Sequence, residues 1–587
     1  MGSNIILNNS IKSSPKEHDK IISPEETINK FKKNIRKSGL DILENTKRID
    51  NGRLNIPVYF SICGKDAKSA IGTKKQMGKG TTAVLAEASA VMELAERYSL
   101  FTFIKNPDNF IIDTCKNLKS RNKSSGQSIP SDKIIPFRLI AQSVHDKSDD
   151  MEVLEEIFST LPLKWTWSYN ITTKEDMLIP FDWFYTINEF NGSSAGNSTE
   201  EAISQGLSEL VERHVSSIIS QNCIEVPKID PNSITDKASL AMLENYKKAG
   251  IKIYLSDFSL DTGIPTVGIL AYDPSTFPQS SEIVWTAGTS PDPQKALSRA
   301  LTEVAQLAGD FNTDANYVAS GLPKFSKLKE ANFIINAKKT ISITDLPDPS
   351  HNNIKTEIEN CVKVLAKNKM EVLSISTKHP KLDIPTFYSI IPGAHFRERA
   401  INSSVGMFVT KHIAENCPPK EAIEQLTSID LKLTGKYYIS FYIGLSYLSL
   451  QNPVKALEYF KKAVNLNPAD QDIPSIYSYM GVCLKEMAKY EKALEVLEKG
   501  IAIDKSREDI FNLMGFCNFK LKKHEKAIEC FQNVLALNPG SGIEYANIAS
   551  NYRDMGNKNK AITYYKIALE FDPTLDFARE NLGKLTE

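Results

Sequence analysis

Two segments of the sequence place carboxylates and an arginine at the same helical spacing. Each contains four polar residues at offsets 0, 4, 7 and 8, which share one face of a helix with about 3.6 residues per turn. In residues 89–97 the four are Ser89, Glu93, Glu96 and Arg97. In residues 205–213 they are Gln205, Glu209, Glu212 and Arg213. One such stripe alone is typical of a solvated helix face, but its repetition favours a shared function.

A third segment, KALSRALTEVAQ (residues 295–306), has Arg299, Glu303 and Gln306 at offsets 0, 4 and 7. Small and apolar residues surround all three stripes, so solvent cannot lie on every side. If the stripes converge, four or more carboxylates meet in a partly buried place, and their repulsion requires cations. Mg²⁺ suits such a cluster, because it binds few carboxylates together with waters and phosphate oxygens. The arginines would contact phosphates through forked hydrogen bonds, so we predict a metal-held nucleoside triphosphate.

The usual phosphate-binding loop is absent. GTKKQMGKG (residues 72–80) has five residues between Gly72 and Gly78, and Gly80 stands where a P-loop requires Ser or Thr. Gly78 and Gly80 still permit close approach of the backbone to a phosphate, and Lys79 supplies a point charge.

Size and composition limit the class of protein that must position these residues. The chain has 587 residues, too many for one hydrophobic core, and its 71 basic residues balance 71 acidic ones. A neutral chain favours neither nucleic acid nor an anionic membrane as partner. The eight cysteines contain no CxxC pair, which argues against a zinc site and for a reducing, cytoplasmic compartment. The sequence shows no signal peptide and no apolar run of membrane-spanning length.

Helices and strands alternate up to about residue 415, which predicts an α+β domain. Residues 1–24 are polar, and we expect them to be disordered. Helices are predicted over 82–105, 199–219 and 292–309, and another begins near Pro24 and ends at Gly39. Strands are predicted over 56–63, 251–258, 264–273, 370–377 and 384–391.

From about residue 435 the chain repeats. Gly444, Gly481 and Gly515 each precede an alanine by twelve residues, and these alanines are Ala456, Ala493 and Ala527, with Ala561 continuing the series. The alanines step by 37, 34 and 34 residues. This period, with aromatic residues after three of the alanines at Tyr459-Phe460, Phe531 and Tyr564-Tyr565, resembles the tetratricopeptide repeat. We predict an all-α solenoid over 435–587, with 416–434 either a linker or a degenerate repeat. It either binds a peptide or protein, or only stabilises the first domain.

The polar motifs together resemble the YcaO family. They are GKG (78–80), SAxxExxER (89–97), SAGNxxxEAxxQGLxELxER (194–213) and RALTExxQ (299–306). The resemblance spans about residues 24–415, and we assign 25–415 to this domain. No PxPxP end is present, so the chain resembles the non-azoline members, including accessory factors for methylthiolation of ribosomal protein S12. Residues 52–58 read GRLNIPV where the family usually has DRxGIPV, so only Arg53 matches at that start.

The resemblance implies an internally duplicated fold, a homodimer, and ATP with Mg²⁺ as cofactors. Metal-binding positions fall on Glu93, Glu96, Glu201, Glu209 and Glu212. Nucleotide-contact positions fall on Arg97, Ser194, Asn197, Gln205, Arg213, Arg299 and Glu303, with Lys79 and Ser89 matched more loosely. No Ser-His-Asp or Cys-His arrangement suggests covalent catalysis, and His214 is interpreted as structural.

The implied reaction is activation of a peptide backbone amide. A nucleophile adds to the carbonyl, ATP phosphorylates the oxygen, and phosphate leaves, as in post-translational modifications such as thioamidation. The repeats would recruit a peptide or protein partner, a sulfur-delivery or methylthiotransferase protein among the candidates. The alternative is an accessory or adaptor protein for methylthiolation of ribosomal protein S12, which binds ATP without amide chemistry of its own.

Overall fold

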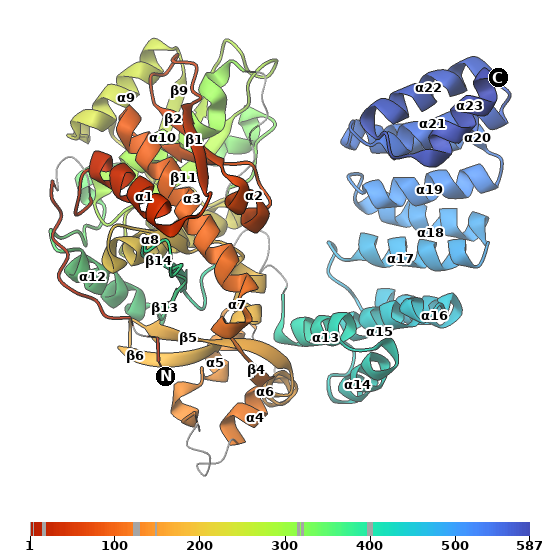
Figure 1. Ribbon diagram of the computed structural model, residues 1–587, viewed down its shortest axis with the longest axis horizontal. Coiled ribbons are helices and arrows are strands. Elements are labelled where there is room, and N and C mark those ends of the chain that lie inside the picture. Colours follow the sequence, from red (N-terminus) through yellow and green to blue (C-terminus); the bar gives the residue numbers. More distant parts are fainter. Residues whose placement is uncertain are drawn as a thin grey trace. The chain divides into compact units, whose positions relative to one another are not determined.

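The computed structural model describes residues 2–3, 5–14, 19–120, 129–146, 150–313, 317, 322–395 and 403–587. The chain divides into two units (Figure 1). The first contains Met1–Lys147 and Ser159–Ser404, and the second contains Ser148–Phe158 and Val405–Glu587. The second unit therefore begins at Val405, ahead of the region 416–434 predicted as a linker or degenerate repeat, and it includes a short segment from within the first domain's sequence.

The first unit is mixed α/β and contains three sheets. The smallest has the antiparallel order β1 (Leu43–Arg48), β2 (Val58–Cys63) and β3 (Lys75–Lys79). The second has the order β11 (Val284–Thr289), β10 (Thr266–Tyr272), β9 (Lys252–Asp257), β8 (Lys228–Ile229) and β12 (Thr340–Ile341). The third has the order β4 (Ile111–Thr114), β5 (Pro162–Asn170), β13 (Leu373–Ser376), β14 (Thr386–Ile390) and β7 (Ser193–Ala195), with β6 (Glu175–Pro180) paired to β5. Strands β3, β7 and β11 are each an edge strand of one of these sheets.

Each of these three end strands leads into a long helix. The helices are α3 (Ala83–Lys105), α8 (Thr199–Asn222) and α10 (Pro293–Ala308), which confirms the three predicted helices within a few residues. The side chains of Thr82, Ser198 and Asp292 cap their N-termini by accepting backbone N–H groups. The buried face of each helix consists mainly of alanine, valine and leucine side chains. The strand, the cap and this buried face together determine which way the polar face of each helix points.

The remaining helices of the first unit cover the sheets. Helix α1 (Pro24–Ser38) has a capping box at Ser23 and ends at Gly39 with φ 69°, as the sequence predicted. The others are α2 (Lys65–Ile71), α4 (Cys115–Ser120), α5 (Phe137–Gln142), α7 (Phe181–Asn188), α9 (Lys237–Lys248), α11 (Asn332–Ile335) and α12 (Ile354–Lys367). A large apolar cluster lies between α9, α10 and the five-stranded sheet.

The prediction of a disordered N-terminus is wrong for the residues described there. Ser10 donates to Glu200 (2.6 Å), and the buried Lys12 forms an ion pair with Glu357 (2.5 Å). Ile5 is also buried. Composition alone suggested disorder, but buried polar partners on α8 and α12 hold this segment in place.

The second unit is a stack of helix pairs. Four pairs match the predicted repeats: α15 (Tyr437–Ser449) with α16 (Pro453–Val464), α17 (Ile473–Glu486) with α18 (Tyr490–Ile503), α19 (Glu508–Lys520) with α20 (His524–Leu537), and α21 (Gly542–Asp554) with α22 (Lys558–Phe571). Helix α23 (Asp576–Thr586) follows them. A further pair, α13 (Val405–Asn416) and α14 (Pro419–Lys432), precedes them. Residues 416–434 are therefore largely helical.

The glycines of the repeats each face a large side chain sixteen residues later. A Cβ atom added to Gly444 would press on Phe460, and one added to Gly515 would press on Phe531. At Gly481 the facing residue is Leu497. Absence of a side chain on one helix thus makes room for the bulky residue of its partner, as the sequence spacing suggested.

Helix α6 (Met151–Ser159) lies against the first helix pair of this unit. Phe158 and Phe408 have ring centroids 6.3 Å apart. Glu156 pairs with Lys432 (2.8 Å), and Asp150 just before the helix pairs with Lys436 (3.6 Å). A helix from the middle of the first domain's sequence therefore completes the beginning of the solenoid.

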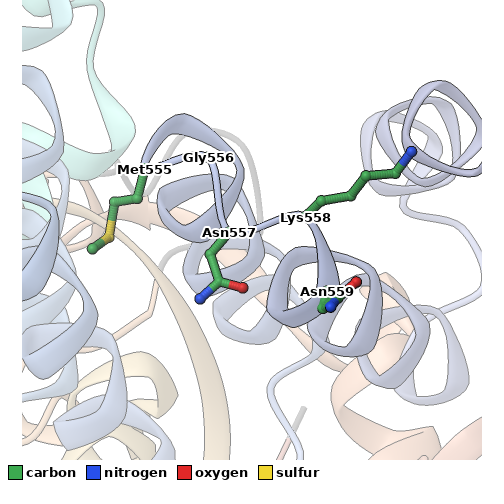
Figure 2. Close-up of a pocket in the computed structure, with 5 residues that line it drawn as sticks. All are labelled: Met555, Gly556, Asn557, Lys558 and Asn559. Atoms are coloured by element: carbon green, nitrogen blue, oxygen red, sulfur yellow. The ribbon is translucent and has the colours of Figure 1, made fainter.

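A depression in the surface of the repeats carries little functional information. Figure 2 shows a depression at the turn between α21 and α22, lined by Met555, Gly556, Asn557, Lys558 and Asn559. Its lining contains no carboxylate, histidine or cysteine. Among the helices that the structure describes, none is long and apolar enough to cross a membrane.

Candidate nucleotide and metal site

The site is built from the same strand–helix unit used three times. Gly78, Ser194 and Gly288 hold equivalent strand positions, and eight residues later each helix has an alanine, at Ala86, Ala202 and Ala296. Twelve residues later come Ala90, Gly206 and Ala300. A Cβ atom on Gly78 or Gly288 would collide with the helix backbone at Ala90 or Ala300. In the middle unit the missing side chain is on the helix, where a Cβ on Gly206 would lie 2.9 Å from Ser194 Oγ.

The three units interlock in a cycle. Each helix contacts its own strand and also the strand of the next unit: α3 contacts β7, α8 contacts β11, and α10 contacts β3. Backbone hydrogen bonds follow the same pattern, since Thr289 N on β11 donates to Glu212 on α8 (3.0 Å). This arrangement brings the polar faces of all three helices to one place. The three helices whose stripes the sequence analysis compared are thus neighbours in the fold, and the strand–helix unit occurs three times.

Four carboxylates from α3 and α8 are gathered here. Burial, with a further contribution from Glu209, raises the pKa of Glu93. Burial raises the pKa of Glu96 to about 8, and the charges of Glu93 and Glu209 add to the effect. Burial also raises the pKa of Glu212, again with repulsion from Glu209. Such mutual repulsion is the expected consequence of bringing the two acidic stripes together.

Four cationic side chains lie among the carboxylates. Lys79 forms an ion pair with Glu303. Arg97 lies 3.6 Å from Glu96, and Arg213 lies 3.5 Å from Glu209. Arg299 donates to Gln205 Oε1 (2.8 Å). The guanidinium of Arg97 also rests on the ring of Phe190, 4.3 Å from its centroid.

Glu201 is the main exception to the predicted set. One of its oxygens accepts from Ile21 N (2.6 Å) and the other from Asn197 N (2.8 Å). Its side chain therefore accepts from two backbone N–H groups, one in the N-terminal segment and one just before α8. Asn197 lies beside it and donates to Thr27 (3.0 Å). The half-buried Ser89 lies one turn before Glu93 on α3.

The residues of the cluster fit an anion and a divalent metal. Three buried polar atoms have no hydrogen-bond partner among the described residues: Arg97 Nη1, Arg213 Nε and Ser194 Oγ. Guanidinium groups with unused donors suit phosphate oxygens. Across the same described ranges, no three acidic, histidine or cysteine side chains are already arranged around a metal position. The carboxylates thus lie near one another, and Arg97 and Arg213 lie within ion-pair distance of two of them, Glu96 and Glu209.

Several groups that contact the site glutamates could not be predicted from the types of residue in the sequence. Gly192 N donates to Glu209 (3.2 Å), and Thr289 N donates to Glu212. Both are backbone groups, which carry no signal in a sequence pattern. His214 is buried, and its Nδ1 accepts from His395 N (2.9 Å). That hydrogen bond is consistent with the structural interpretation of His214.

Comparison with known proteins places this arrangement in a family. Residues 77–395 match the family model described as "YcaO cyclodehydratase, ATP-ad Mg2+-binding". Tetratricopeptide-repeat models match residues 437–470, 508–541 and 545–575. The protein belongs to the YcaO family and carries C-terminal tetratricopeptide repeats.

Relatives of the first domain include proteins with and without a named role. An uncharacterized protein of Methanothermobacter thermautotrophicus is 25% identical over 64% of this chain and 95% of its own length. The ribosomal protein S12 methylthiotransferase accessory factor YcaO of Escherichia coli is 26% identical over 49% of this chain and 48% of its own.

Solved structures show the same fold. YcaO from Methanopyrus kandleri, bound with AMPPCP and Mg²⁺, has 22% identity and a TM-score of 0.50, covering 68% of this chain and 96% of that one. A heterocyclase in complex with substrate and cofactor has 21% identity and a TM-score of 0.52, covering 68% of this chain and 55% of that one.

Proposed function

We propose that the protein is an ATP- and Mg²⁺-dependent enzyme that activates a backbone amide of a peptide. The observation that carries the proposal is the meeting of four half-buried glutamates and four cations from three interlocked units. Membership of a family whose model is described as binding ATP and Mg²⁺ supports it. ATP, when bound, supplies the phosphoryl group that turns the amide oxygen into a leaving group.

The residues of the chain would divide this work. Glu93, Glu96, Glu209 and Glu212 would hold the metal, because carboxylate oxygens are the ligands that Mg²⁺ prefers. Arg97, Arg213 and Arg299 would bind phosphate oxygens, and Ser194 with Asn197 would orient the nucleotide from the start of α8. The charge neutralisation by the arginines and the positioning of the reactants are the main contributions a protein makes to phosphoryl transfer.

The deciding experiment is calorimetric titration of ATP into the full-length protein, with and without Mg²⁺. Binding should require Mg²⁺, and Glu209→Ala should weaken it at least about tenfold, because a ligand and its charge are removed. Glu87→Ala is the matched control on α3, since Glu87 pairs with Lys32 (3.3 Å) outside the cluster. Equal ATP binding by wild type and Glu209→Ala would contradict the proposal.

The repeats favour a second candidate function. The solenoid supports a protein-binding role, and one relative is named as an accessory factor for S12 methylthiotransferase. Under this alternative the chain binds ATP and a partner without amide chemistry of its own. Purified ribosomal protein S12 is a suitable probe. Its binding without ATP consumption would favour the accessory role, whereas peptide-dependent phosphate release with a change in peptide mass would favour the enzyme.

A further inference from the structure

Lys79 has a place in the three-unit arrangement that no other cation shares. It follows Gly78 directly and is the last residue of β3. The equivalent strand positions of the other two units are held by Ala195 and Thr289. Only the first unit therefore extends a positive charge from its strand into the space where the helices meet.

The surroundings of Lys79 come from helices of all three units. Its ammonium pairs with Glu303 on α10, and its charge also interacts with Glu212 on α8 and Glu93 on α3. Burial, aided by repulsion from Arg299, lowers the pKa of Lys79 to about 8. One cation on the first unit thus interacts with carboxylates from all three helices.

The charge of Lys79 makes it a counter-ion for these carboxylates. An ammonium is a compact, strongly hydrated point charge on a flexible stem, so it can replace a metal ion electrostatically and can also move away. We propose that Lys79 is a built-in cation that holds the place of a divalent metal among Glu93, Glu212 and Glu303, and that a metal must displace it. The inference rests on the proposed function, since it concerns the same site.

Displacement gives Lys79 a second position. Once a metal neutralises the carboxylates, the ammonium is repelled by it and is attracted to the phosphates of a nucleotide. Lys79 would thus oppose binding of metal alone and favour binding of metal together with nucleotide. A lysine that merely held the fold together would favour both, so the two interpretations predict effects of different sign.

The test compares wild type, Lys79→Met and Lys75→Met in the full-length protein. Lys75 lies on the same strand with its ammonium 4.0 Å from the ring centroid of Phe60, so it is the matched control. Two titrations are made by calorimetry at pH 7: Mg²⁺ alone, repeated with Mn²⁺, and ATP in saturating Mg²⁺. Lys79→Met should bind the metal alone about tenfold more tightly and ATP about tenfold more weakly, whereas Lys75→Met should change neither.

Three outcomes would overturn the inference. Weaker binding of both metal and ATP by Lys79→Met would assign Lys79 a structural role. Unchanged affinity for the metal would show that Lys79 does not compete with it. Absence of metal binding without nucleotide in both wild type and Lys79→Met would show the same. Failure of the proposed function is distinguishable, because it would appear as absent ATP binding in wild type, whereas the metal titrations would still report on Lys79.

Discussion

The raised pKa of Glu96 makes the free energy of unfolding of the metal-free protein depend on pH. Its pKa moves from the ordinary 4.5 to about 8 on folding, so the folded protein retains a proton that the unfolded chain loses. Because the folded state binds more protons over this interval, its stability falls as pH rises from about 4.5 to about 8 and is level above that. Each unit of pKa shift corresponds to about 1.4 kcal/mol.

Glu96→Gln should remove this dependence, because the amide resembles the protonated carboxyl and cannot ionise. From the two pKa values, ionisation of Glu96 lowers the stability of the folded wild type by about 3 kcal/mol more at pH 8 than at pH 5. In the absence of metal, the variant should therefore be more stable than wild type by up to about 3 kcal/mol at pH 8. The difference should nearly vanish at pH 5. Binding of Mg²⁺ should be weakened at every pH, so stability and function would change in opposite directions.

Urea unfolding followed by tryptophan fluorescence is the suitable assay. All four tryptophans, Trp165, Trp167, Trp183 and Trp285, belong to the first unit, so the signal does not report on the repeats. Wild type, Glu96→Gln and the control Glu87→Gln are compared in EDTA at pH 5, 6.5 and 8. A stability gain by Glu96→Gln that is the same at all three pH values, or no gain, would refute the reasoning.

Three further predictions concern other parts of the chain. Gly288→Ala should lower the free energy of unfolding by about 1–3 kcal/mol through overpacking and should weaken ATP binding, because β11 and α10 must separate. The control Gly583→Ala lies at an open helical position and should raise the free energy of unfolding by about 0.5–1 kcal/mol. Calorimetry measures ATP binding, and urea unfolding measures the stability of Gly288→Ala. Unchanged stability and ATP binding in this variant would disprove the close approach of β11 to α10. Lys12→Met should leave Glu357 as an uncompensated buried charge, at a cost of about 3–5 kcal/mol, and limited proteolysis should then cleave the N-terminus; adding Glu357→Gln should restore resistance, and continued resistance of Lys12→Met alone would count against the ion pair. Asn512→Leu removes a 2.6 Å donor from the buried Glu544 and should cost about 1–3 kcal/mol, seen as faster amide exchange in α19 and α21 and not in α15.

The polar stripes were predictable because a helix converts spacing into a face. Offsets that repeat in α3 and α8 place Glu93 and Glu209 at equivalent positions, and the convergence follows once the helices are taken as copies of one unit. The repeats were predictable for a similar reason, since Gly515 and Phe531 satisfy one packing rule. These are local regularities, and local regularity is what a sequence displays directly.

Other features depend on contacts between distant residues. The N-terminal segment appeared disordered by composition, but Lys12 finds a buried partner 345 residues away in sequence. Glu201 matched the acidic pattern, yet backbone N–H groups at Ile21 and Asn197 occupy it. The short strands β3 and β7 carry no alternation, because the first is half-exposed and the second has three residues. Nothing in the local sequence reports these pairings.

Helix α6 has a consequence for the synthesis of this protein on the ribosome. Its side chains Leu154, Ile157 and Phe158 are buried, and the structure places the segment with a helix pair that begins about 250 residues later in the chain. At translation rates of about 5–20 residues per second, that interval lasts roughly 10–50 s. Throughout it, the nascent first domain has an apolar helix whose partners do not yet exist. The first helix pair of the second unit can therefore be completed with α6 only after the whole first domain has been synthesised.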